Sequence, residues 1–110
     1  MLYGIDLWMA LEYNAGSLSE FFTRTKLFEE FAYEEIKRLS DMSSIDNYYL
    51  VVHSVKSVAK GVGAYLLANT AETVELRKDN EFARTTNAVL IEEYKRVRRG
   101  LKELREKTGH

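Results

Sequence analysis

The stretch from Ile45 to Gly63, with the sequence IDNYYLVVHSVKSVAKGVG, decides the fold. Its apolar residues recur at three- and four-residue steps, which is the period of an α-helix, although valines are also common in strands. On a helical wheel the face opposite His53 holds Tyr48, Val51, Val55, Val58 and Val62, flanked by Val52 and Ala59. The face around His53 holds Asp46, Tyr49, Lys56, Ser57 and Lys60. We therefore expect a helix whose only interior histidine faces water beside two lysines.

The composition of the chain favours one domain, spanning residues 1–110, built from long helices. There is no proline, there are six glycines, and 30% of the residues are charged. The absence of cysteine excludes disulfides and thiolate metal sites and favours a cytoplasmic setting. A net charge of −1 argues against a general nucleic-acid binder, and no apolar run has the length of a membrane span. We expect a monomer.

A short helix and a long helix are predicted before the central stretch. Residues 5–13 predict a short helix with Leu7, Trp8 and Leu11 on its apolar face, packed across the end of a larger bundle. Residues 14–16 form its stop signal. Ser17 and Glu20 form a capping-box pattern at the start of a helix that runs to about residue 40. Its apolar stripe holds Leu18, Phe21, Thr25, Phe28, Ala32, Ile36 and Leu39, widened by Phe22 and Phe31.

Two more helices are predicted after the central stretch, which ends near Gly61 or Gly63. Residues 64–78 predict a helix with an inward face of small and branched side chains, and the last helix covers residues 81–107. The inward residues are Leu67, Ala71 and Val74 in the first and Phe82, Leu90, Tyr94, Val97, Leu101 and Leu104 in the second. We expect an all-α, antiparallel up-and-down four-helix bundle with a short extra N-terminal helix. His110 falls in a frayed end without a function.

The residues around His53 suit phosphoryl transfer. The neutral ring nitrogen of an exposed imidazole is a nucleophile, and Lys56, one turn further on, can offer charge-assisted hydrogen bonds to phosphoryl oxygens. Lys60, two turns on, is a weaker candidate because ordinary solvation explains it equally well. Ser57 is small, so a partner can approach the histidine closely. An inert surface histidine is the alternative.

Several short motifs resemble those of histidine-containing phosphotransfer (HPt) domains. The run from His53 to Ser57, HSVKS, followed by Gly63-Ala64 starting ten residues after the histidine, resembles their HxxK(G/S) to GA signature. Residues 4–6 resemble the entry motif of the family, residues 46–48 lead into the active helix, and residues 71–75 resemble the helix after it. Ser57 departs from the glycine of many members, although serine is still a small residue.

The resemblance implies a phosphorelay intermediate without a nucleotide site of its own. It implies that His53 accepts a phosphoryl group from a receiver-domain aspartate and passes it to another receiver, in response regulators or hybrid histidine kinases. Lys56 is then expected to stabilise the phosphorylated ring. The resemblance implies no cofactor in this chain, because Mg²⁺ comes with the receiver. The expected binding residues for the receiver are Tyr49, Leu50, Ser57, Lys60 and Gly63.

Two features leave alternatives open. Tyr49 and Leu50 supply apolar docking surface around His53 unless the first helix or the loop before Asp46 covers one of them. A non-catalytic helical adaptor that binds receiver or kinase domains would keep the same fold. A further alternative is an anionic-partner site on the basic run of the last helix, although its interleaved glutamates favour a solvated face. That run holds Lys95, Arg96, Arg98, Arg99, Lys102, Arg105 and Lys107, interleaved with Glu92, Glu93, Glu103 and Glu106.

Overall fold

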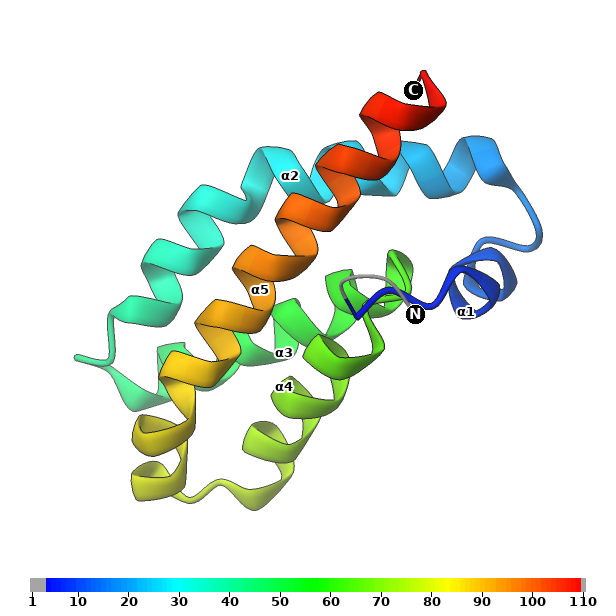
Figure 1. Cartoon of the computed structure of the whole chain (residues 1–110). Coiled ribbons are helices and arrows are strands. Elements are labelled where there is room, and N and C mark those ends of the chain that lie inside the picture. Colours follow the sequence, from blue (N-terminus) through cyan, green and yellow to red (C-terminus); the bar gives the residue numbers. More distant parts are fainter. Residues whose placement is uncertain (1–3, 110) are drawn as a thin grey trace.

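The chain is all-helical in the computed structural model, which describes residues 4–109 (Figure 1). The helices are α1 (Leu7–Tyr13), α2 (Leu18–Ser40), α3 (Ile45–Gly61), α4 (Tyr65–Arg77) and α5 (Asn80–Thr108). They cover 84% of the described residues, among which there is no strand, and this confirms the predicted all-α class. Within residues 4–109, no helix is long and apolar enough to cross a membrane. The prediction for His110 lies outside the described residues.

The four long helices pack in a closed sequence of neighbours. Helix α3 contacts both α2 and α4, and α5 contacts both α4 and α2, while α1 lies against α3 and α2. The core between them is aromatic and branched, and its largest fully buried side chains include Tyr48, Tyr94, Phe21, Leu39, Leu67, Leu90 and Leu101. The inward face predicted for α4 is confirmed, because each of its three residues is fully buried. Helix α3 is therefore held on both flanks, and the orientation of its outer face is set.

A buried polar contact joins three helices near the end of the bundle where α2 ends and α3 and α5 begin. The Tyr48 hydroxyl on α3 donates a 2.7 Å hydrogen bond to Asn87 Oδ1 on α5. Asn87 Nδ2 in turn donates to the Leu39 carbonyl at the end of α2, at 2.8 Å. Burial raises the pKa of Tyr48 to about 12, so its hydroxyl stays a protonated donor. Three helices are thereby joined through one asparagine, whose donor and acceptor are both used.

The buried face of α3 is turned from its predicted position. Val52 and Ala59 were expected to flank the core, and both are 0% exposed. Val58 and Val51 were expected within the buried face, but Val58 is 37% exposed and Val51 is only half-buried. The reason is that α3 packs against two neighbours, so the direction between α2 and α4 sets the centre of its buried face. Val58 lies at the margin of the buried face, where it lines a groove between α2 and α3.

The predicted apolar face of α1 is wrong at Leu7 and Trp8, although Leu11 is half-buried, and the apolar stripe of α2 is narrower than expected. Leu7 and Trp8 are exposed, whereas Ala10 is 1% exposed. Large side chains do not fit under α1, because its backbone passes close to the α3–α4 turn: Asp6 N donates to the Gly63 carbonyl at 2.6 Å. On α2, the end residue Leu18 and the flanking Phe31 are exposed, and the rest of the stripe is buried or half-buried.

Local signals place the helix ends. Ser17 Oγ accepts a 3.1 Å hydrogen bond from Glu20 N, as its predicted cap role requires. Gly63, just after α3, has φ +71°, the left-handed conformation that was expected of Gly61 or Gly63. Asp79 caps α5 by accepting from two backbone N–H groups, so α5 begins one residue before its predicted start. These end signals place the turns that let consecutive helices pack against one core.

Candidate functional site

His53 lies on the outer face of α3. Its side chain is 60% exposed, which confirms the prediction that it faces water. The buried Val52 next to it holds the helix against the core, so the direction of the imidazole is set by packing. The nearest polar group is on the neighbouring helix: Nδ1 of His53 lies 2.5 Å from Oε2 of Glu75 on α4. The ring is therefore exposed on one edge and held on the other.

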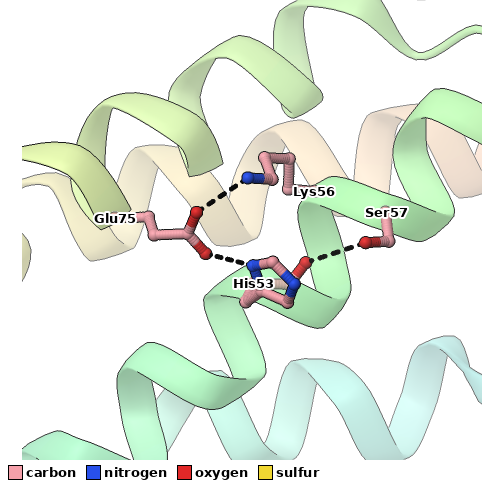
Figure 2. A network of polar contacts seen from close by, with 4 residues as sticks. All are labelled: His53, Lys56, Ser57 and Glu75. Carbon is pink, nitrogen blue, oxygen red and sulfur yellow. Dashed lines mark hydrogen bonds and ion pairs between the residues drawn. The ribbon is translucent and has the colours of Figure 1, made fainter.

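Glu75 binds two side chains of α3 at once (Figure 2). Its Oε1 accepts a 2.7 Å hydrogen bond from Lys56 Nζ, while Oε2 contacts His53. Lys56 is only 16% exposed, which corrects the expectation that it faces water beside the histidine. The hydrogen bond from Lys56 is the largest cause that lowers the pKa of Glu75, and the contact with His53 lowers it further, against the effect of burial. Glu75 is an anion at neutral pH.

The ionised carboxylate determines which tautomer of His53 is favoured. A carboxylate only accepts hydrogen bonds, so Nδ1 carries the proton and donates it to Glu75. In the neutral ring Nε2 then keeps its lone pair. No side chain or backbone group among residues 4–109 makes a hydrogen bond to Nε2, and Figure 2 shows this nitrogen directed away from Glu75. The site therefore presents one free, exposed nucleophilic nitrogen.

The two small or basic residues that follow on α3 are also exposed. Ser57 Oγ bonds back to the His53 carbonyl at 3.3 Å, so its side chain stays close to the helix and leaves the space beside His53 open. Lys60 is exposed, and within the described part of the chain it forms no ion pair. Gly63 is buried beneath α1, against Asp6 and Ala10. It is not part of the exposed surface near His53, which corrects its assignment as a binding residue.

The apolar surface expected next to the histidine is smaller than predicted. Leu50 is 68% exposed, as a docking residue should be. Tyr49 is half-buried, because its hydroxyl donates a 3.0 Å hydrogen bond to Asn80 Oδ1 and its ring packs edge-on against Tyr48. The start of α5, rather than α1 or the loop before Asp46, therefore covers Tyr49. Leu50 is the one member of this pair that is free for a partner.

Glu75 is the residue of this candidate site that the sequence did not assign. It lies within the 71–75 motif, but the motif alone does not assign it a role. The available signal is its position: Ala71, one turn earlier, and Val74, one residue earlier, are both fully buried, so Glu75 borders the packed face of α4. Glu72 lies one turn earlier on the same side of α4, because residues three apart share a helix face, and it lies further from the packed face than Glu75. The rotation of α4 against α3 brings Glu75 rather than Glu72 to His53.

The remaining candidates for function find little support in the geometry. The described residues contain no group of three or more His, Cys, Asp or Glu side chains that could hold a metal ion. On the basic face of α5, Arg105 is ion-paired with Glu29 of α2, and Lys95 lies 3.8 Å from Glu92 on its own helix. Pairing of this kind is typical of a solvated helix face and of helix packing, and it leaves less free charge for an anionic partner.

The comparisons with known proteins leave the family of this chain open. No family model, no curated protein and no solved structure matches it. The resemblance to HPt domains therefore stays a prediction, and the arrangement of His53, Glu75 and Lys56 is the observation from which a function can be argued.

Proposed function

We propose that this protein is a phosphorelay intermediate. In this proposal His53 Nε2 accepts a phosphoryl group from the aspartyl phosphate of a receiver domain and passes it to the aspartate of another. The observation that carries the proposal is the carboxylate of Glu75, which contacts both His53 Nδ1 and Lys56 Nζ and leaves Nε2 free on a ring that is 60% exposed. An inert surface histidine would need neither partner.

The reaction can be written with the groups that are present. The Nε2 lone pair attacks phosphorus, the bond from phosphorus to the aspartyl oxygen breaks, and the aspartate leaves as a carboxylate. The phosphorylated ring keeps the proton on Nδ1 and becomes an imidazolium. Glu75 accepts the hydrogen bond from this N–H and balances the new positive charge. In the return step an aspartate oxygen of the second receiver attacks phosphorus, and the bond to Nε2 breaks.

Lys56 acts mainly through Glu75 in this proposal. Its ammonium group is bound to the carboxylate at 2.7 Å, and this keeps Glu75 ionised and oriented toward the ring. Stabilisation of the phosphoryl oxygens by Lys56, as the resemblance implies, would require the lysine to leave Glu75. Lys56 is thus proposed as a positioning residue, and Lys60 stays a solvated charge two turns away.

The proposed architecture is an antiparallel up-and-down four-helix bundle with a short extra N-terminal helix. Its support is the closed sequence of packing neighbours and the alternating directions of the four long helices in Figure 1.

The proposed partners are receiver domains of response regulators and hybrid histidine kinases. We propose that this protein binds them as a monomer in the cytoplasm. Leu50 and Ser57 offer exposed surface for docking. A relay requires rapid release, so this interface should be small. Mg²⁺ is proposed to come with the receiver.

Transfer of radiolabel tests the function. The protein is mixed with phosphorylated receiver domains and Mg²⁺, beside His53→Gln and, as a matched control, His110→Gln at the other histidine of the chain. The expected result is acid-labile, base-stable label on the parent and on His110→Gln, and none on His53→Gln. Phosphorus NMR should place the label on Nε2. Label on His53→Gln would contradict the assignment, and no label on any form across several receivers would favour the non-catalytic adaptor.

A further inference from the structure

A groove between α2 and α3 contains a cavity of about 310 Å³ on the flank of α3 that faces away from Glu75. Its walls are apolar, and they include Leu27 and Phe31 from α2 and Val58 from α3. All three side chains are at least 37% exposed, so the groove is open to solvent along this side. The volume lies at the lower end of the range of small-molecule pockets, roughly 300–1,000 Å³.

A nearly buried carboxylate also lines this apolar cavity. Glu35 is only 8% exposed, and its one hydrogen bond is a long one of 3.5 Å from Ser54 Oγ. No Lys or Arg nitrogen of the described residues lies within ion-pair distance of it. Burial raises the pKa of Glu35, and the charge of Arg38, one turn further on α2, opposes that shift only in part. Glu35 thus keeps most of its hydrogen-bonding capacity unused.

The other charged side chain that lines the cavity, Arg24, already contacts residues outside it. Arg24 lines the end near Gly61, where its Nε donates a 2.6 Å hydrogen bond to Asn14 Oδ1 and its guanidinium lies over the Tyr13 ring. It is therefore held toward α1 and does not neutralise Glu35. The cavity combines apolar walls, a tethered cation at one end and an unpaired anion in its wall.

We propose that this cavity binds a small apolar molecule that carries a primary ammonium group. The ammonium donates to Glu35, and the hydrocarbon or aromatic part of the ligand packs against Leu27, Phe31 and Val58. Charge complementarity selects this class: a carboxylic acid would meet Glu35 as a like charge, and a neutral apolar molecule would bury the carboxylate without a partner. The proposal does not depend on phosphorylation of His53.

Titration of the full chain with 4-phenylbutylamine tests the proposal, with the neutral 4-phenylbutan-1-ol as its matched probe. Binding is followed by amide chemical shifts in nitrogen-labelled protein. The expected result is saturable shifts centred on Ser54 and Gly61, with a Kd for the amine at least about tenfold lower than for the alcohol, because a charged hydrogen bond is at stake. Glu35→Gln should remove this preference, while Glu93→Gln, a half-buried glutamate outside this cavity, should keep it.

Val58→Trp supplies a second, independent test at a rim position outside the core. The indole should fill part of the cavity and weaken both probes. If Glu35→Gln does not fold, the ratio of the two Kd values on the parent and the Val58→Trp result decide the question. Equal affinity for amine and alcohol on the parent, shifts centred elsewhere, or unchanged binding by Val58→Trp would each overturn the proposal.

Discussion

His53 Nδ1 on α3 lies 2.5 Å from Glu75 Oε2 on α4, although the two residues are 22 positions apart in the chain. The contact joins the exposed imidazole to the Glu75 carboxylate, which also accepts a hydrogen bond from Lys56 on α3. Because a carboxylate can only accept, the contact selects the Nδ1–H tautomer and leaves Nε2 as the nucleophile. The proposed transfer chemistry depends on this one interhelical contact.

Replacing Glu75 with glutamine should slow phosphoryl transfer. The amide carries no charge to balance the phosphorylated imidazolium, and it can bond to either tautomer of His53. We expect a rate of label uptake from a phosphorylated receiver that is lower by about 100-fold, the scale typical of losing one contact that stabilises developing charge. Nitrogen NMR of the His53 ring should show the Nδ1–H form dominant in the parent and a mixture of tautomers in Glu75→Gln.

The matched control for this variant is Glu72→Gln, on the same helix one turn earlier. It removes the same charge from α4 without touching His53, so both the transfer rate and the tautomer should match the parent. A Glu75→Gln protein with the parent's rate and tautomer would show that the contact has no role in transfer.

The contribution of Glu75 to stability should depend on pH in acid. Its pKa in the folded protein lies below the ordinary value of 4.5, mainly because of the hydrogen bond from Lys56. The stabilisation is therefore present above that value and is lost as the pH falls through the lowered folded pKa. We expect it to be below about 1 kcal/mol for a pair this close to the surface. Urea unfolding of parent and Glu75→Gln from about pH 5 to about pH 3 measures it. A difference that grows with falling pH would have the wrong sign.

Gly63→Ala should destabilise the fold strongly. A Cβ at Gly63 would lie 2.3 Å from the Asp6 carbonyl oxygen and 2.8 Å from Ala10 Cβ, on a backbone with φ +71°. Strain and overpacking together should reduce the free energy of unfolding by about 2–4 kcal/mol. Gly16→Ala is the matched control, because φ is +78° there and no heavy atom lies within 4 Å of the new Cβ. It should cost about 1 kcal/mol, and equal losses in urea unfolding would contradict the packing argument.

Adjacent tyrosines on α3 should respond differently to loss of the hydroxyl. Tyr48→Phe leaves the buried Asn87 Oδ1 without its donor, so we expect a loss of about 1–3 kcal/mol. Tyr49→Phe removes an exposed hydrogen bond to Asn80, and its effect should stay within about 0.5 kcal/mol. Chemical denaturation of the two variants side by side provides the measurement. A larger loss of unfolding free energy for Tyr49→Phe than for Tyr48→Phe would contradict the assignment of the stabilising buried hydrogen bond to Tyr48.

Most of the helical pattern could be predicted because its causes are local. The 3.6-residue period marks each long helix, and short-range signals such as Ser17 and Gly63 mark the ends, since a cap needs only neighbours in the chain. The exposure of His53 could be predicted in the same way, from the phase of apolar residues on a single helix. These features need no knowledge of where the other helices lie.

The sequence by itself therefore determined the all-helical class, the approximate helix ends and the exposed histidine. Tertiary structure decided that Lys56 turns to Glu75, that Val52 is buried while Val58 borders a groove, and that Ala10 rather than Trp8 faces the core. The physical reason is that such contacts depend on the rotation and offset of one helix against another. Those two quantities come from close packing of the whole core, and no periodicity within a single helix contains them.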